Sequence, residues 1–285
     1  MKFAITFVVL FTQFATVSLA SEILICQTEA EKYKYRIELA QLILDKTATE
    51  YESSKIVSYV RKGESDPSQA RCLWLLFHGM VDLIYMPATT ERLELYQPVK
   101  VDIHNGMLGY RVLLIHKKNQ HLFTKIKSVE GLKKFKGGFG AQWGDYKIFA
   151  LNNLPVVGVI NTHYLIPMLN AGRFDYFHRG LHEAWLEIES YQTEFPDLKV
   201  EENLVLVYDL PVYFMFNIKN KSLKNRFLKG FEIIKKDGSF KELFLKHFGH
   251  IAKKANLKNR TFIRIKYHNP EGLPPIDTDL WYRFD

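Results

Sequence analysis

An arginine near the middle of the chain offers a positive charge where an anion could be held. Arg179 follows residues 174–177, which we expect to form a strand, and precedes a helix that we expect to begin at Leu181. A guanidinium and the free backbone N–H groups of a helix N-terminus both attract negative charge. A second interpretation stays open, in which Arg179 pairs with Glu183 or Glu187 on that helix.

A glycine-rich segment, residues 137–144, is the next candidate for binding chemistry. It contains Gln142 and Trp143 among its glycines. Glycine lets the backbone approach a bound molecule closely, and an indole is a flat apolar wall. The segment lacks the Lys-Ser/Thr ending of a nucleotide-phosphate loop. We therefore predict that Gln142 and Trp143 bind a ligand, with a tight turn that packs Trp143 into the core as the alternative.

The two cysteines, Cys26 and Cys72, each adjoin an apolar run, where small buried residues are expected. An oxidising compartment would permit a disulfide between them. Sequence alone does not fix the distance between their α-carbons, so a disulfide and two buried thiols both stay open.

Motifs for catalysis and metal binding are missing from the sequence. There is no Gly-x-Ser-x-Gly elbow, and neither cysteine lies in a nucleophile motif. His178 and His182 are four residues apart, but a strand end and a helix separate them, so the pair does not have the helical spacing of two metal ligands. We expect no metal, no cofactor and no enzymatic activity.

The first 20 residues have the pattern of a signal peptide. Lys2 precedes the apolar residues 3–11, and Ser18 and Ala20 are the small residues that precede a cleavage site. Cleavage after Ala20 would leave 265 of the 285 residues and lower the formal net charge from +8 to +7. An uncleaved anchor is the alternative. We expect a periplasmic monomer with no nucleic-acid partner, although basic chains can bind one.

A pattern occurs twice, in residues 73–85 and 165–177: an apolar helix-like run, then Gly-x-x-Asp, then a short apolar strand. Glycine can adopt the left-handed conformation that ends a helix, and an Asp after the turn can accept hydrogen bonds from local backbone amides. The repeat predicts two similar α/β lobes rather than one sheet.

Strand and helix patterns alternate along the rest of the chain. Asp66 and Pro67 are expected to begin one helix, as N-cap and first helical residue. Short apolar runs joined by helices predict mostly parallel sheets that are covered on both faces. The predicted strands are residues 23–26, 53–59, 83–86, 112–115, 156–160, 174–177, 204–207 and 213–218; the predicted helices include 31–47 and a pair over 222–256 that is broken at 237–238.

Five short motifs, in their order and spacing, carry a resemblance to a known family. Residues 79–82 and 89–92 are similar to a "G-x-x-D … T-x-x-R" stretch, 128–132 to an "S-x-x-D-L" opening, 171–175 to "A-G-R-x-D", and 237–240 to a "D-G-S/T" turn. The chain resembles the type II periplasmic solute-binding proteins, in particular the substrate-binding proteins of amino-acid ABC transporters.

The resemblance implies a two-lobed α/β fold. Each lobe would be a mostly parallel sheet flanked by helices, and a two-strand hinge near residues 112–116 and 210–216 would join them. Lobe 1 is then 21–113 plus 214–268, lobe 2 is 114–213, and 269–285 form a C-terminal tail on the surface.

The resemblance also implies ligand contacts. The family's carboxylate-gripping arginine corresponds to Arg92, with Thr89 and Thr90 beside it, and a guanidinium fork matches a carboxylate. The alternative is that Arg92 pairs with Glu91 or Glu94 on an exposed helix.

The second lobe departs from the family pattern. The aspartate that holds a ligand's ammonium group in that family is replaced by Gly180, and Arg179 stands next to it. We therefore predict an anionic or dicarboxylate-like ligand between Arg92 and Arg179.

Three functions are consistent with these residues. The first is a receptor that closes on a small polar ligand, amino-acid-like or carboxylate, and presents it to the membrane permease of an ABC transporter. The second is a ligand-sensing or interaction module for a membrane signalling protein. The third is a small-molecule lyase on the same fold.

Overall fold

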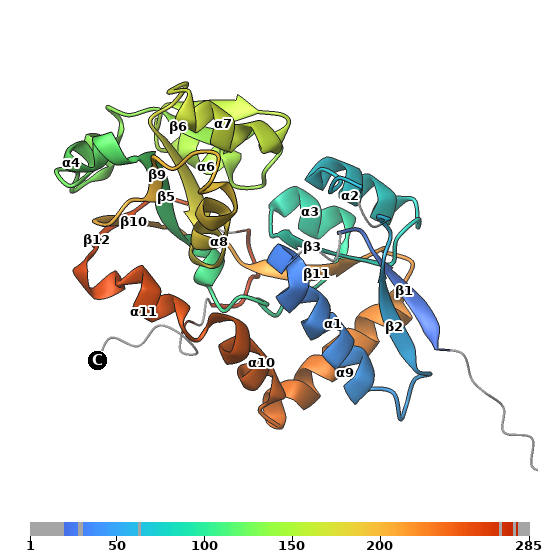
Figure 1. Ribbon diagram of the computed structural model, residues 1–285. Helices are drawn as coiled ribbons and strands as arrows, with labels where there is room; N and C mark the ends of the chain where they lie inside the picture. The colour runs from blue at the N-terminus through green and yellow to red at the C-terminus, as the bar shows by residue number, and fades with distance from the viewer. Residues whose placement is uncertain (1–19, 28–30, 62–63, 268–269, 276–277, 279–285) are drawn as a thin grey trace, which may run out of the picture.

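The computed structural model describes residues 20–27, 31–61, 64–267, 270–275 and 278. Apart from Ala20, the predicted signal peptide lies outside these residues, as does much of the predicted tail. The chain forms two α/β lobes that lie side by side (Figure 1). Within the described residues, no helix is both long and apolar enough to cross a membrane.

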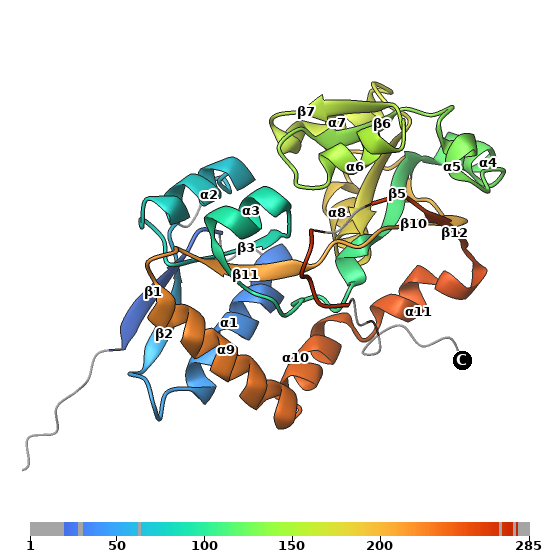
Figure 2. The ribbon, with the colours of Figure 1, turned by 180° about the vertical axis from the view of Figure 1, so that it is seen from behind.

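The first lobe is built on a five-stranded sheet in the order β2-β1-β3-β11-β4. The strands β1, β2 and β3 pair in parallel, whereas β11 pairs antiparallel with β3 and β4. Figures 1 and 2 show α1 and α9 on one face of this sheet and α2 and α3 on the other. The elements are β1 (Ser21–Ile25), η1 (Glu31–Tyr33), α1 (Lys34–Lys46), β2 (Ser54–Ser58), α2 (Gln69–Phe77), β3 (Leu83–Pro87), α3 (Thr90–Leu95), β4 (Gln97–Val99), β11 (Val212–Phe216), α9 (Lys221–Lys236) and α10 (Ser239–Phe248).

The second lobe is built on a seven-stranded sheet in the order β12-β10-β5-β8-β6-β7, with β9 paired to β5. Parallel and antiparallel pairs occur in both sheets, so each sheet is mixed rather than mostly parallel. The elements are η2 (Met107–Gly109), β5 (Tyr110–His116), η3 (Lys117–Asn119), α4 (Gln120–Phe123), α5 (Val129–Leu132), β6 (Gly137–Gly140), α6 (Tyr146–Leu151), β7 (Val156–Val159), η4 (Thr162–Tyr164), α7 (Leu165–Asn170), β8 (Tyr176–Gly180), α8 (Leu181–Tyr191), β9 (Leu198–Val200), β10 (Leu204–Val207), α11 (Ile251–Ala255), η5 (Leu257–Asn259) and β12 (Thr261–Arg264).

The passages between the lobes differ from the predicted hinge. β5 lies wholly in the second sheet and β11 wholly in the first, so the chain crosses before Tyr110 and again between Val207 and Val212. β12, which the prediction assigns to lobe 1, pairs with β10 in the second sheet. A hydrophobic pattern shows that a strand is buried, but it does not show which sheet the strand joins.

The repeated glycines adopt the predicted conformation. Gly79 has φ +70° and Gly172 has φ +68°, and each follows a helix. In both copies the N–H of the residue after the glycine bonds a carbonyl five residues earlier, at 2.9 and 3.0 Å. This is the Schellman arrangement that ends a helix. The two lobes therefore end these helices in the same way.

The repeated aspartates also play one role in both lobes, but the predicted local partner is wrong. The Asp82 carboxylate accepts the N–H of Leu24 at 2.9 Å, and the Asp175 carboxylate accepts that of Lys136 at 2.7 Å. Leu24 lies in β1 and Lys136 directly precedes β6, 58 and 39 residues away in sequence. Each Asp thus ties its own strand to the neighbouring one.

Two helix boundaries differ from the prediction. Ser68 is the N-cap of α2 and accepts the N–H of Arg71, whereas Asp66 pairs with Lys32 at 2.7 Å. The break at 237–238 is confirmed, with Gly238 at φ +84°, but the region holds a third helix, α11. Both Asp and Ser are good caps, so sequence could not choose between two that lie two residues apart.

A disulfide joins Cys26 to Cys72. It links the end of β1 to α2 within a small apolar cluster that also contains Ile84, Tyr96 and Tyr213. Both cysteines are buried in this cluster. The bond therefore fixes α2 to the sheet of the first lobe.

Candidate functional site between the lobes

The N-terminus of α3 positions Arg92. Thr89 is the N-cap, and its hydroxyl accepts the Arg92 N–H at 3.3 Å. The Arg92 side chain is buried, with Nη1 donating to the Pro87 carbonyl at 2.9 Å and Nη2 donating to Gln69 Oε1 at 2.8 Å. Burial lowers the pKa of Arg92. Thr90, the first residue of α3, is exposed.

The loop after β6 brings the second lobe against Arg92. A Cβ on Gly144 would come within 2.9 Å of Arg92 Nη1 and 3.3 Å of Thr89 Cγ2. The backbone of this loop therefore lies directly on the guanidinium, and a larger residue would require the guanidinium or the loop to shift. Gln142, two residues earlier, is exposed. The structure thus brings three predicted regions together: the α3 N-terminus, Arg92 and the glycine-rich segment.

Trp143 packs on its own lobe and stays half-buried. Its ring lies 5.7 Å from Phe139 and 6.0 Å from Phe177, between centroids. A Cβ on Gly140 would come within 2.4 Å of the indole, so this glycine is required for the packing. The Arg179 guanidinium lies over the indole at 5.3 Å. Trp143 therefore connects the glycine-rich segment to the end of β8.

Arg179 is ion-paired within its own lobe. Its guanidinium lies 3.4 Å from Glu183 Oε1 and also pairs with Glu187. Although burial opposes the effect, these two carboxylates raise the pKa of Arg179. The same interaction lowers the pKa of Glu183 against the effect of burial. The structure therefore has the arrangement that the sequence left open as the second interpretation, a pairing along α8.

A buried ion pair that sequence reasoning missed lies directly behind Gly144. Arg111 Nη2 donates to Asp145 Oδ2 at 2.9 Å, and the Tyr208 hydroxyl donates to the same oxygen at 2.7 Å. Arg111 Nη1 also lies 3.6 Å from Glu183 Oε2. Against the effect of burial, Arg111 lowers the pKa of Asp145. An arginine inside the apolar run of β5 was the signal for this pair.

A second group of buried side chains that the sequence did not predict joins the lobes beside the hinge. Arg36, on α1, donates from Nε to His104 Nε2 at 3.0 Å, and its Nη2 lies 3.0 Å from His182 Nε2 on α8. The two imidazoles stack at 4.7 Å. Burial lowers the pKa of His104 and that of His182, the latter to about 3, so both rings are neutral acceptors for Arg36. The Arg36 guanidinium also lies over Tyr85.

The charges at this interface are unequal. Four arginines face three carboxylates, and the carboxylates are all paired with the two arginines of the second lobe. Of the ion pairs among the described residues, none includes Arg36 or Arg92, the two arginines of the first lobe. The first lobe therefore presents to the second lobe two arginines that have no carboxylate within ion-pair distance, although Asp145 and Glu91 act on Arg92 from farther away. The residues are Arg36, Arg92, Arg111 and Arg179 with Asp145, Glu183 and Glu187.

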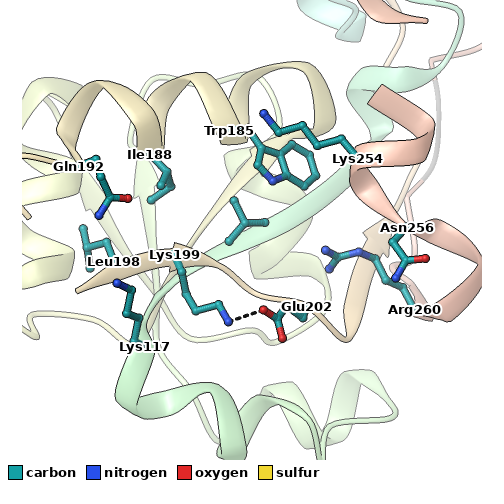
Figure 3. A pocket seen from close by; sticks show the side chains of 11 residues that line it. Lys117, Trp185, Ile188, Gln192, Leu198, Lys199, Glu202, Lys254, Asn256 and Arg260 are labelled. Atoms are coloured by element: carbon teal, nitrogen blue, oxygen red, sulfur yellow. Dashed lines mark hydrogen bonds and ion pairs between the residues drawn. The ribbon is translucent and has the colours of Figure 1, made fainter. Parts of the chain in front are cut away.

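Neither a metal site nor the two pockets described below mark this interface within the described residues. No group of three His, Cys, Asp or Glu residues there could hold a metal ion. A pocket of about 380 Å³ lies on the second lobe between α8, β9 and α11, where Trp185, Lys199 and Arg260 line it (Figure 3). A second pocket, of about 370 Å³, lies beside α7 on the same lobe. The lining of these two pockets contains none of the predicted ligand-binding residues.

Comparison with known proteins gives a match in structure alone. No family model and no curated protein matches the chain. An ancestral arginine-binding protein bound to arginine matches with a TM-score of 0.60 and 18% identity, over 81% of this chain and 100% of that one. An amino acid ABC transporter substrate-binding protein from Streptococcus pneumoniae, bound to L-arginine, matches with a TM-score of 0.57 and 17% identity, over 80% and 93%.

A signalling protein matches equally well. A histidine kinase sensor domain with similarity to periplasmic binding proteins has a TM-score of 0.62 and 13% identity, over 81% of this chain and 96% of that one. These matches cover both lobes, and they agree with the two mixed sheets described above. The chain therefore has the two-lobed α/β fold of the type II periplasmic binding proteins.

Proposed function

We propose that this chain is a solute-binding protein whose two lobes close on a small ligand that carries a carboxylate, with Arg92 as the group that binds it. The observation that carries the proposal is the buried Arg92 guanidinium, which lies against Gly144 of the other lobe and donates to neutral acceptors. A guanidinium has five N–H donors in a fork that matches a carboxylate. A ligand carboxylate at Arg92 would therefore contact both lobes.

The charge balance supports an anion rather than a zwitterion. Asp145, Glu183 and Glu187 are each paired with an arginine of their own lobe. A ligand ammonium group would have to compete with an arginine for one of these carboxylates, and the loss of one partner from a buried pair costs about 3–5 kcal/mol. A ligand carboxylate would instead compensate the positive charge of Arg92. The proposal thus favours a carboxylate that has no ammonium group.

The other predicted ligand-binding residues keep supporting roles in this proposal. Thr89 fixes the α3 N-terminus under Arg92, and Thr90 lies at the exposed rim. Trp143 offers a half-buried apolar wall, and Gln142 an exposed amide beside it. Because Arg179 is paired with Glu183 and Glu187, we assign it to orienting Trp143 through its contact with the indole rather than to binding the ligand carboxylate.

The proposed partner is a membrane protein. We infer an exported, periplasmic receptor from the pattern of residues 1–20, with delivery of the ligand to an ABC permease. A sensing role is the second candidate, and the match to a histidine kinase sensor domain favours it. Uptake of labelled ligand by cells that lack this chain separates the transport role from the sensing role, because uptake is lost only if the chain serves a transporter.

Mass analysis of the exported protein tests cleavage after Ala20.

The ligand class is tested with pairs of compounds that differ only in an ammonium group. Glutamate and glutarate form one pair, and phenylalanine and 3-phenylpropionate form another. A ligand that binds the folded state alone raises its stability, by about 2.7 kcal/mol at a hundredfold excess over Kd. We expect the thermal midpoint to rise more with the compound that lacks the ammonium group.

Two other outcomes would contradict parts of the proposal. A larger shift with the amino acid of each pair would refute the preference for an anion and leave the receptor role standing. A ligand that is converted to product, seen by NMR after incubation, would replace the receptor by an enzyme. The NMR control is needed because an ancestral amino acid-binding protein that is a precursor of cyclohexadienyl dehydratase matches this chain with a TM-score of 0.57.

A further inference from the structure

The pocket of about 380 Å³ between α8, β9 and α11 has an apolar floor and an aromatic wall (Figure 3). The floor is formed by the buried side chains of Ile188, Leu198 and Val200. The wall is Trp185 on α8, which is partly buried, and Lys254 Nζ lies 5.8 Å from its ring centre. A cavity of this volume is large enough for a small organic molecule.

A buried arginine points into this pocket. The Arg260 side chain is 4% exposed, and Figure 3 shows its guanidinium directed towards the middle of the pocket. Nε donates to the Ala255 carbonyl at 2.6 Å. Nη1 donates to the carbonyls of Glu201 and Leu204 at 2.6 and 3.0 Å. Nη2 has no hydrogen-bond partner among the described residues. The guanidinium is therefore fixed in place, and the N–H groups of Nη2 are left for a bound molecule.

The positive charge of Arg260 is only partly compensated. Among the described residues, the carboxylate within ion-pair distance of it is that of Glu201, whose Oε2 lies 3.7 Å from Nη1. This carboxylate also accepts the backbone N–H groups of Asn203 and Leu204. Burial lowers the pKa of Arg260, although Glu201 and Glu202 act in the opposite direction. An anion bound at Nη2 would offset the unfavourable burial of this charge.

Lysines add to the positive charge of the pocket. Lys117, Lys199 and Lys254 line it, and Lys117 has no ion pair among the described residues. Lys199 pairs with Glu202, and Lys254 pairs with Glu189. The lining holds four basic side chains and one acidic side chain, and it stays positive when the two outside carboxylates that pair with it are counted. The pocket therefore favours an anion.

We propose that this pocket is a second ligand site, separate from the interface between the lobes, and that it binds a small aromatic carboxylate. The carboxylate would accept hydrogen bonds from Arg260 Nη2, and the ring would lie against Trp185 over the apolar floor. An inorganic anion would leave the floor uncovered, and an uncharged ring would leave Nη2 without a partner. This site does not depend on the proposed function, because it shares no residue with the site at Arg92.

Nuclear magnetic resonance of the chain with ¹⁵N-labelled tryptophan tests the location of the site. The probe is 2-naphthoate, which has one carboxylate on a rigid aromatic body, and Trp185→Phe identifies the indole N–H signal of Trp185. We expect 2-naphthoate to move this signal to saturation, in the unaltered chain and equally in the Arg92→Gln variant. The second result separates this site from the one between the lobes.

Calorimetric titration with 2-naphthoate, in the Arg92→Gln background, tests the roles of the two side chains. Arg260→Gln should raise Kd at least about tenfold, whereas Arg173→Gln, at an exposed arginine of the same lobe, should leave it unchanged. Because Arg260 also holds three carbonyls, Trp185→Leu gives a second comparison. It should weaken binding, and Trp74→Leu, at an exposed tryptophan of the first lobe, should not.

Two results would overturn the second site. One is a Trp185 signal that does not move when 2-naphthoate is added. The other is an equal shift of this signal with 2-naphthalenemethanol, which has the same ring and no charge, because the pocket would then not recognise the carboxylate.

Discussion

Replacing His178 by phenylalanine should make the protein resist acid better. His178 lies fully buried on β8, with its ring 4.3 Å from Phe139 and 4.7 Å from Phe149. Neither ring nitrogen has a hydrogen-bond partner among the described residues, and Nε2 lies 3.8 Å from Asp145 Oδ2, beyond hydrogen-bond length. Phenylalanine fits these aromatic neighbours and carries no group that takes up a proton.

The size of the expected change in unfolding free energy follows from the pKa of His178. Burial lowers the pKa of His178 from 6.5 to about 4, Arg111 acts in the same direction, and Asp145 opposes them. The unfolded chain therefore binds the proton first as the pH falls. The contribution of His178 to stability is complete above pH 6.5 and is lost as the pH falls towards 4. Between about pH 7.5 and about pH 5 this loss is about 2 kcal/mol.

Urea unfolding at several pH values measures the effect. We expect the fall in unfolding free energy between neutral pH and about pH 5 to be smaller in the His178→Phe variant by about 2 kcal/mol. His163→Phe, at an exposed histidine of the same lobe, is the control and should leave the pH dependence unchanged. An equal pH dependence in the His178→Phe variant and the unaltered chain would refute the reasoning.

Three further changes test the packing that supports the site. Asp102→Ala should lower the unfolding free energy by about 3 kcal/mol, because the buried carboxylate accepts three backbone N–H groups at the hinge, and urea unfolding measures this. Gly230→Ala should cost about 1–3 kcal/mol in the same assay, because its Cβ would come within 2.5 Å of Ile43 Cγ2 where α9 meets α1. Replacing Cys26 and Cys72 by alanine should cost about 4 kcal/mol, the loop-closure contribution for a separation of 46 residues, and a thermal melt compares the two chains.

Local sequence rules predicted the elements well where one residue type decides the backbone. Gly79 and Gly172 end their helices in the left-handed conformation, as only glycine does without strain. The apolar runs predicted β3 and β10 within one residue of their observed ends, whereas the predicted strand 174–177 ends three residues before β8 does. No strand was predicted at the position of β12. For β5 the sheet could not be predicted, because its apolar residues would be buried in either sheet.

The candidate site was only partly visible in the sequence. Arg92, Thr89 and the loop at Gly144 do meet, but the motif that identified Arg92 says nothing of the lobe packed against it. The buried partners Arg111 and Asp145 are 34 residues apart, and a pair of this kind is visible only when the chain is folded. The same holds for Arg36 and His182, which are 146 residues apart.

Calorimetric titration of the Arg92→Gln variant tests the central claim most directly. The ligand is the compound that gives the largest thermal shift, and Arg173→Gln, at an exposed arginine of the second lobe, is the control. A hydrogen bond to a charged group contributes about 1.5–3 kcal/mol, so the loss of Arg92 should raise Kd at least about tenfold. We expect the control to bind as the unaltered chain does. An Arg92→Gln variant that binds with unchanged affinity would contradict the account.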